Sequence, residues 1–278
     1  MNRNRVKLSL QQTFLLTTGV WLALPVFGAI PFWLGATAAR VVDAFFEAMS
    51  GLTTTGATVL TGLQDLPQGL LVWRSMLQWF GGVGIIVVAM VFLPELRVGG
   101  VPIFRSESFD TDGKVLPRAA QIAARISAAY FILTLACYLA YIGAGVPGFH
   151  AMNHALTTVA TGGFSTYDVS FGALKGAPEY VAALFMALAS LPFVRYVQIM
   201  AGSMSPMLQD PQIRGFLMAL GAVYIVIIAY LALNGMGLEQ AVREAVFNVS
   251  SILTGTGYAS TDYQLWGGFA VVIFFLIG

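Results

Sequence analysis

The sequence has little charge and almost no cysteine. Charged side chains make up 10% of its 278 residues, against about 25% in an ordinary soluble domain, while hydrophobic residues make up 58%. This composition excludes an intrinsically disordered chain and an ordinary water-soluble enzyme. The formal net charge of +1, from 14 basic and 13 acidic residues, excludes the basic surface of a nucleic-acid-binding protein. A single cysteine, Cys137, excludes an internal disulfide and a cysteine-based zinc site.

The class that remains is a polytopic membrane protein, and long uncharged runs support it. Leu8–Ala39, Ser75–Pro94 and Gly215–Leu238 contain no charged residue, and a helix needs about 20 mostly apolar residues to cross a bilayer. The first run is interpreted as a retained span because it is long and lacks the cleavage site of a signal peptide. We therefore predict an all-α membrane protein with five complete spans and one incomplete span, at roughly 11–33, 75–94, 126–146, 180–204, 214–234 and 263–278.

Three Thr- and Gly-rich segments between paired spans resemble one another. They can be aligned on the pairs Thr55-Gly56, Thr161-Gly162 and Thr256-Gly257. The position nine residues before each of these glycines is then polar and is occupied by Glu47, Asn153 and Asn248. An internal repeat is sought before a fold is assigned, and the unit here is span, short amphipathic helix, Thr/Gly loop, span. The short helices are expected at roughly 44–53, 149–159 and 243–253.

This unit sets the predicted organisation of the chain. Repeat 1 covers 1–95, a cytoplasmic loop covers 96–125, repeat 2 covers 126–205, and repeat 3 covers 206–278 with an incomplete second span. The Thr/Gly segments are named loop 1 (53–59), loop 2 (158–166) and loop 3 (253–261). The sequence thus predicts two complete repeats and a partial third.

The basic residues are distributed unequally between the two sides of the predicted membrane. With the N-terminus in the cytoplasm, ten Lys and Arg lie inside and four outside, as the positive-inside bias requires; the external four are Arg40, Arg74, Lys175 and Arg243. Eight of the 13 acidic residues then lie outside. The outer mouth, where all three loops are expected, is therefore net negative, and such a mouth raises the local concentration of cations.

Loops of this composition suit a cation pathway. Irregular backbone at membrane depth is tolerated where it is buried in protein or lines a water-filled cavity. Backbone carbonyls can replace the hydration shell of a cation, and glycine allows successive carbonyls to turn toward one axis. The helix before each loop would direct its partially negative C-terminus at the ion. The alternative is three extracellular turns, in which Gly and Thr are also common; three loops in register favour the pore.

Four stretches carry a family resemblance: FFEAMSGLTTTGATVL at 45–60, WRSMLQWFGGVGI at 73–85, TTVATGGFST at 157–166 and FNVSSILTGTGYASTDY at 247–263. They resemble the Trk/Ktr/HKT superfamily, most closely the bacterial Trk membrane subunit of potassium uptake. The resemblance implies M1–pore-helix–M2 units around one permeation path, with a single glycine in each filter. By position it implies K⁺ contacts around nine residues: Thr54, Thr55, Gly56, Ala160, Thr161, Gly162, Gly255, Thr256 and Gly257.

The resemblance also implies a location and partners. It predicts a multi-pass protein of the bacterial inner membrane, K⁺ as the transported ion, a peripheral cytosolic nucleotide-binding regulatory subunit and a homodimer. The family continues beyond the second span of its third repeat, so this chain is expected to be a C-terminally truncated fragment. In the superfamily a serine in place of the first filter glycine goes with Na⁺ transport, and Gly56 favours K⁺.

Other functions stay open at this stage. A Na⁺-permeable or non-selective cation transporter and an alternating-access carrier are the alternatives. A membrane-embedded enzyme is disfavoured because the long predicted spans lack Asp and Glu. His150 and His154 are four residues apart, as in the zinc motif of metalloproteases, but Ala151 stands where that motif needs a glutamate. We therefore expect the two histidines to pack or hydrogen-bond around the second pore helix.

Three further features receive structural interpretations. Arg195 is expected either to snorkel or pair near the end of the fourth span, or to face the pore. The sequon at Asn248 falls in a predicted pore helix, so Asn153 and Asn248 are expected to hydrogen-bond backbone behind the loops. The glycines of Gly81-Gly82-Val83-Gly84 follow no strand, so they indicate close helix packing and no nucleotide loop.

Overall fold

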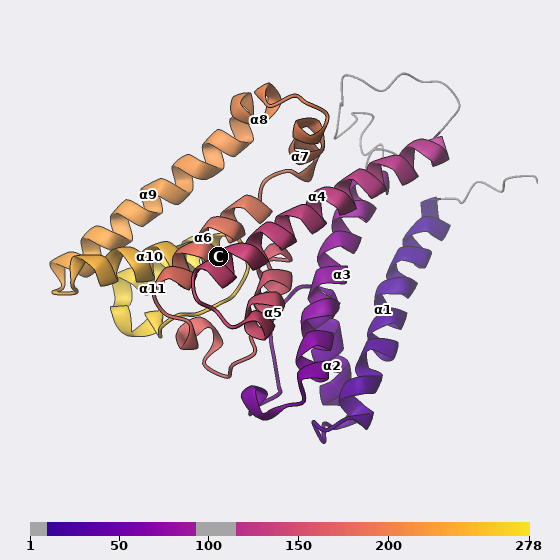
Figure 1. Ribbon diagram of the computed structural model, residues 1–278, viewed down its shortest axis with the longest axis horizontal. Helices are drawn as coiled ribbons and strands as arrows, with labels where there is room; N and C mark the ends of the chain where they lie inside the picture. The colour runs from indigo at the N-terminus through magenta and orange to yellow at the C-terminus, as the bar shows by residue number, and fades with distance from the viewer. Residues whose placement is uncertain (1–9, 93–114) are drawn as a thin grey trace, which may run out of the picture.

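The computed structural model describes residues 10–92 and 115–278, and within these ranges every regular element is helical. The helices form three successive groups that lie next to one another in chain order, from α1–α3 at one end of the molecule to α9–α11 at the other (Figure 1). Each group is a long helix, a shorter helix, a loop with a 3₁₀ turn and a further helix. The structure therefore has the repeated architecture that the sequence predicts.

Repeat 1 consists of α1 (Leu10–Leu34), α2 (Val41–Leu52), the 3₁₀ turn η1 (Leu63–Asp65) and α3 (Gln68–Phe92). The short helix α2 packs between α1 and α3. Its buried face carries Ala44, Ala48 and Gly51, small residues that allow this close contact. The helix α2 thereby places loop 1 beside α3.

Repeat 2 begins with α4 (Val115–Gly143) and α5 (Gly148–Val159), followed by η3 (Ser170–Ala173). Its second span is broken into α6 (Ala177–Ala189) and α7 (Phe193–Met200), which are bent by 88°. Pro192 is the last residue of the break, directly before α7, and disfavours helical geometry at the residue before it. The span predicted over 180–204 is therefore not a single straight helix.

Repeat 3 consists of α9 (Pro211–Leu233), α10 (Leu238–Leu253), η4 (Tyr263–Trp266) and α11 (Gly268–Ile277), and the short helix α8 (Ser205–Gln209) precedes it. Asp210 caps α9 by accepting a hydrogen bond from the Gln212 amide at 2.8 Å, with proline at the first helical position. Tyr263 belongs to η4, so the helix of the last predicted span begins five residues later than expected.

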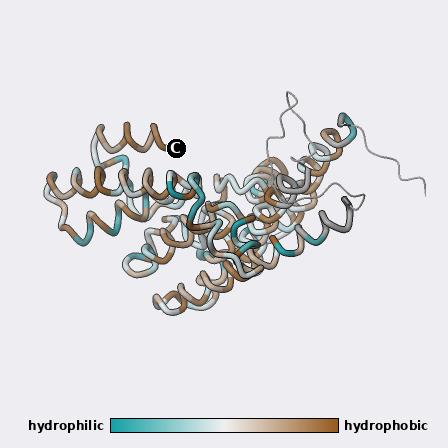
Figure 2. The backbone as a smooth tube through the Cα atoms, turned by 90° about the horizontal axis from the view of Figure 1, so that it is seen from above, coloured by the Kyte–Doolittle hydropathy of each residue, from teal (hydrophilic) through white to brown (hydrophobic). Residues whose placement is uncertain are grey.

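Residues 115–125 are helical, although the sequence places them in a cytoplasmic loop over 96–125; the part of that loop at 96–114 lies outside the described residues. Among the described residues, three helices are long and apolar enough to cross a membrane, within α1, α4 and α9, and the bent pair α6–α7 counts as a fourth if its two helices form one span. Brown, hydrophobic turns recur along the helices that extend away from the centre of the molecule (Figure 2). These features are those of a protein that buries its helices in lipid.

The glycines of α3 allow the close helix packing that the sequence predicts. A Cβ on Gly81 would lie 1.9 Å from the Leu52 carbonyl oxygen at the end of α2, and one on Gly82 would lie 2.5 Å from the Tyr130 hydroxyl of α4. No side chain fits at such distances. The helix α3 therefore contacts both α2 and α4 through positions without a side chain.

Arg195 forms an ion pair with Asp210, with 2.8 Å between Nε and Oδ2, so its structural pairing is confirmed. The Arg195 hydrogen bond holds the pKa of the Asp210 carboxyl below its usual range, and the cap hydrogen bonds lower this pKa further. A carboxyl with a depressed folded-state pKa stabilises the fold above its unfolded pKa of about 3.9, and this stability is lost as the pH falls through the folded-state pKa.

We therefore expect Asp210→Asn to be less stable than the wild type near neutral pH and to lose this difference in acid. The asparagine keeps the cap acceptor and removes the charge, so the pH dependence reports the charge-dependent contacts of Asp210, the Arg195 pair first among them. Thermal unfolding of detergent-solubilised protein between about pH 3 and 7 measures it. A stability difference that is the same at every pH would contradict this assignment.

Candidate ion filter

The three loops share one backbone conformation. Each pore helix (α2, α5 and α10) is followed by one intervening residue and then by two residues with φ in the left-handed region, separated by one other residue. The pairs and their φ values are Thr54 (56°) and Gly56 (79°), Thr161 (47°) and Gly163 (76°), and Gly255 (68°) and Gly257 (81°). Threonine rarely adopts such φ values, and strain of this kind persists where the surrounding structure imposes it. The left-handed pair recurs in all three loops, with threonine strained at its first position in loops 1 and 2, so the folded protein imposes this conformation on each loop.

Backbone hydrogen bonds repeat in the same register. The amide between each left-handed pair donates to a carbonyl five residues earlier, near the end of the pore helix: Thr55 to Ser50 at 2.9 Å, Gly162 to Thr157 at 2.9 Å and Thr256 to Ser251 at 2.8 Å. These bonds engage carbonyls that a helix end leaves without helical partners. Each loop thus turns back tightly over the C-terminus of its own pore helix.

This register corrects the sequence alignment by one residue in loop 2. Gly163, and not Gly162, is equivalent to Gly56 and Gly257, while Gly162 corresponds to Thr55 and Thr256. The polar position of the pore helices is accordingly occupied by Glu47, His154 and Asn248, and Asn153 is not a member of this set. The sequence alignment was off by one residue because loop 2 has two adjacent glycines. The sequence does not show which of the two adopts the left-handed conformation.

Neighbouring loops approach each other at the left-handed glycines. A Cβ on Gly56 would lie 2.2 Å from the carbonyl oxygen of Gly162, and a Cβ on Gly163 would lie 2.0 Å from that of Thr256. A Cβ on Gly257 would meet nothing within 4 Å. The loops are therefore arranged in the order 1–2–3 around an arc. Gly56 and Gly163 are required by both their φ values and this contact, and Gly257 by its φ value alone.

The burial of the nine predicted residues follows this arrangement. Ala160 and Gly162 of the central loop 2 are buried, and Thr161 is half-buried. In loops 1 and 3, Thr55, Gly255 and Gly257 are exposed, Thr54 and Gly56 are half-buried, and Thr256 is buried. The structure thus brings the three predicted sets together, with loop 2 between the other two.

The polar position of each pore helix holds the last part of its loop. Glu47 Oε2 accepts from the Val59 amide at 3.1 Å, and Asn248 Oδ1 accepts from the Ser260 amide at 3.2 Å, two residues at equivalent places. His154 Nε2 lies 3.1 Å from Ser165 Oγ. One helical position therefore secures all three loops with three different side chains.

The expected roles of the histidines and asparagines are largely confirmed. His150 Nδ1 lies 2.8 Å from Thr166 Oγ1, and both histidines hydrogen-bond around the second pore helix. Asn248 binds backbone behind loop 3. Asn153 also binds backbone, since it donates to the Phe149 carbonyl of its own pore helix, and it accepts from Ser75 of α3; its backbone partner lies in the helix and not in the loop.

Side chains of α3 bind loop 2 in a way that sequence reasoning missed. Gln78 Nε2 donates to the Gly162 carbonyl at 2.5 Å, and Gln78 Oε1 accepts from the Phe164 amide at 3.1 Å. Gln78 is fully buried. A buried amide inside a predicted span, in the WRSMLQWFGGVGI stretch, is the signal that could have identified it, because such a group needs polar partners. The second span of repeat 1 thus holds the loop of repeat 2.

Repeated units of helix, tightly turned loop and helix, with their loops gathered on one arc, define a membrane protein of the pore-loop class. The profile of the TrkH family, described as cation transport proteins, matches residues 1–278. The chain belongs to this family.

A solved structure and curated relatives of the same family are similar to this chain. The crystal structure of the potassium transporter TrkH from Vibrio parahaemolyticus superposes with a TM-score of 0.87 at 33% identity, covering 99% of this chain and 57% of that one. The Trk system potassium uptake protein TrkI of Halomonas elongata is 40% identical over 98% of this chain and 56% of its own length. TrkH of Escherichia coli K12 is 34% identical over 98% and 58%. The chain thus spans a little over half the length of the curated relatives it matches.

Proposed function

We propose that this chain forms part of a K⁺ uptake pathway and that loops 1, 2 and 3 line its selectivity filter. The observation that carries the proposal is the alternating left-handed backbone, repeated three times on one arc. Alternation of this kind directs successive carbonyls the same way, which suits a dehydrated cation. The family and the printed names of the relatives, Trk system potassium uptake proteins, support K⁺ as the transported ion.

The proposed ion contacts keep the nine residues named from the sequence and add Gly163. By the structural register the equivalent triplets are 54–56, 161–163 and 255–257, with Ala160 equivalent to Thr53 and Thr254. One residue separates the end of each of the helices α2, α5 and α10 from its triplet, and the partial negative charge of the helix C-termini favours a cation there.

Isotope flux into proteoliposomes that contain the full-length protein tests the proposal. We expect uptake of ⁸⁶Rb⁺, a K⁺ tracer, to exceed that of ²²Na⁺, and K⁺ to compete with the tracer better than Na⁺ does. Equal uptake of the two tracers would favour the non-selective alternative. Currents under voltage clamp separate a pore from an alternating-access carrier. A current that keeps rising with ion concentration, beyond the limit set by the turnover of a carrier, favours the pore.

We also propose a location in the cell and two partners. We place the protein in a bacterial inner membrane with its N-terminus in the cytoplasm, supported by the split of basic residues. The superfamily resemblance supports a homodimer and a peripheral cytosolic nucleotide-binding regulatory subunit. A complex of defined stoichiometry, purified with the regulatory subunit of the same Trk system, tests both.

The orientation can be checked by labelling single cysteines in a Cys137→Ser background. Gln64 and Ser203 are exposed on opposite sides of the proposed membrane. We expect an impermeant maleimide to label Gln64→Cys in intact cells and to label Ser203→Cys only after permeabilisation. The reverse pattern would invert the topology.

A further inference from the structure

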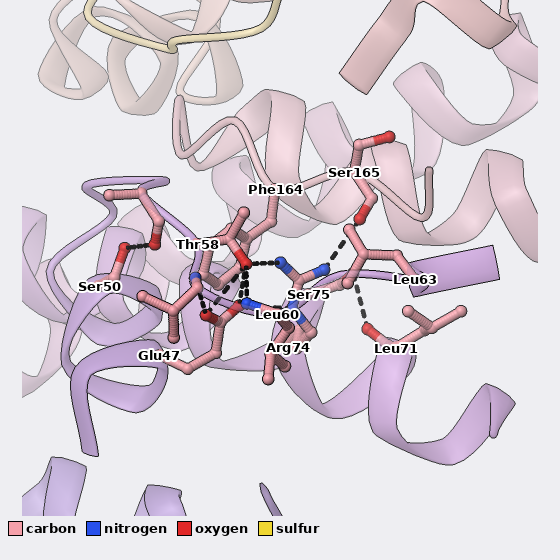
Figure 3. Close-up of polar contacts among 12 residues, drawn as sticks. Glu47, Ser50, Thr58, Leu60, Leu63, Leu71, Arg74, Ser75, Phe164 and Ser165 are labelled. Carbon is pink, nitrogen blue, oxygen red and sulfur yellow. Dashed lines mark hydrogen bonds and ion pairs between the residues drawn. The ribbon is translucent and has the colours of Figure 1, made fainter. Parts of the chain in front are cut away.

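Arg74 is a buried cation that the proposed filter does not yet explain. It lies on α3 with 1% of its surface exposed, and its Nε is 2.8 Å from Oε1 of Glu47 on α2, which is fully buried. The sequence counts both residues among the external charges, but the structure places them inside the protein. Figure 3 shows the guanidinium among side chains and backbone of both loop 1 and loop 2.

The guanidinium joins two repeats through separate donors. Its Nη2 donates to Thr58 Oγ1 of loop 1 at 3.2 Å, and its Nη1 donates to the Ser165 carbonyl of loop 2 at 2.9 Å (Figure 3). Its central carbon lies 4.1 Å from the centre of the Phe164 ring, a cation–π contact. One side chain thereby contacts residues within two positions after the filter triplets of loops 1 and 2.

Glu47 completes the same network. Its carboxylate accepts from Thr58 Oγ1 at 2.9 and 3.0 Å and from the Val59 amide at 3.1 Å. A buried ion pair costs desolvation and is weak evidence for stability, although it can specify one conformation. Here the charged groups fix a geometry: Arg74 spreads several donors in a rigid plane, which the single ammonium of lysine cannot reproduce.

We propose that Arg74 is a positioning residue for ion selection, which fixes loop 2 against loop 1 through the Ser165 carbonyl and the Glu47–Thr58 network. The inference rests on the proposed K⁺ filter. The Gly162 carbonyl lies against Gly56, so a shift of loop 2 changes the spacing of carbonyls between the two repeats. Selectivity depends on that spacing or on the number of carbonyls, and both change with such a shift.

Arg243 offers a matched control. It pairs with the buried Glu179 of α6 and, at 3.1 Å, with Glu239 of its own helix α10, and 12% of its side chain is exposed. It therefore also joins two repeats by a charged contact, but its hydrogen bonds go to helix side chains and not to the loops. Its replacement perturbs packing between repeats without touching the loops.

The test compares Arg74→Lys, Thr58→Val and Arg243→Lys in the full-length protein, in proteoliposomes, with the amount of inserted protein measured for each. We expect Arg74→Lys to lower the K⁺/Na⁺ uptake ratio about tenfold and Thr58→Val about threefold, because the latter removes the bridging hydroxyl and keeps the ion pair. We expect Arg243→Lys to lower stability and to leave the ratio unchanged.

The outcomes are distinct. A wild-type protein without K⁺ preference would refute the proposed function. A selective wild type whose ratio survives in both Arg74→Lys and Thr58→Val would overturn the role of Arg74, as would an equal loss of ratio in Arg243→Lys. Where Arg74→Lys fails to insert, Thr58→Val decides: a lowered ratio supports the inference and an unchanged ratio overturns it.

Discussion

Gly56→Ala is expected to lower the K⁺/Na⁺ uptake ratio of the full-length protein about tenfold or more. Two separate effects act at this residue. Its φ of +79° costs about 1–2 kcal/mol once a Cβ is present. That Cβ would also lie 2.2 Å from the Gly162 carbonyl oxygen, so the carbonyl of the neighbouring loop must move. Uptake of ⁸⁶Rb⁺ and ²²Na⁺ into proteoliposomes measures the ratio.

The K⁺/Na⁺ ratio falls because the substitution weakens the binding of K⁺ and of Na⁺ by different amounts. A displaced carbonyl that weakened K⁺ and Na⁺ equally would lower flux and leave the ratio unchanged; the ratio changes about tenfold for each 1.4 kcal/mol of difference between the two ions. We expect K⁺ to lose more, since the proposed spacing of carbonyls suits the larger ion. Gly257→Ala should have a smaller effect, because its φ of +81° is strained but its Cβ would meet nothing within 4 Å.

Gly62→Ala is the matched control. Gly62 also has a left-handed φ of +69°, but it lies beyond the loop, and a Cβ there would meet only Asp65, at 4.0 Å. It introduces similar backbone strain without disturbing a carbonyl of the arc. A ratio that falls equally in Gly62→Ala and Gly56→Ala would show that general strain, and not the filter geometry, controls selection.

Much of the fold could be predicted because apolar runs and repeated motifs can be recognised in the sequence without knowing which distant residues are in contact. The lengths of the uncharged runs indicate the long helices of repeats 1 and 3, and the spacing of Thr/Gly segments indicates the three pore helices. The break between α6 and α7 was missed, although Pro192 marks it, because the surrounding residues are apolar enough to continue a span. Hydropathy alone does not distinguish a straight span from a sharply bent one.

The site was harder to predict because its contacts join distant parts of the chain. Gly162 and Gly163 are identical as residues, and the contacts of the folded loop assign the left-handed φ to the second. Arg74 stands at the end of an uncharged run and resembles an interfacial charge. Its burial depends on the Ser165 carbonyl, 91 residues later, and on Glu47, 27 residues earlier. Such a partner set exists only after repeats 1 and 2 have packed.

Gly81→Ala is expected to have the largest effect on stability, because no side chain fits where α3 crosses the end of α2. The new Cβ would lie 1.9 Å from the Leu52 carbonyl oxygen and 2.8 Å from its carbon. These are backbone atoms, so the helices themselves must separate, whereas overpacking against side chains alone costs about 1–3 kcal/mol. We expect much less inserted protein and a lower midpoint of thermal unfolding in detergent.

Gly84→Ala provides the comparison within the same helix, since a Cβ at Gly84 would meet nothing within 4 Å. Alanine favours a helix over glycine by up to about 1 kcal/mol, so this variant should be as stable as the wild type or more stable. The separation in Gly81→Ala also moves Leu52, the last residue of α2, and with it the start of loop 1. The protein that does insert should therefore have a reduced K⁺/Na⁺ ratio as well. Wild-type stability and selectivity in Gly81→Ala would mean that α2 and α3 do not meet at this glycine, and that the position of loop 1 does not depend on their contact.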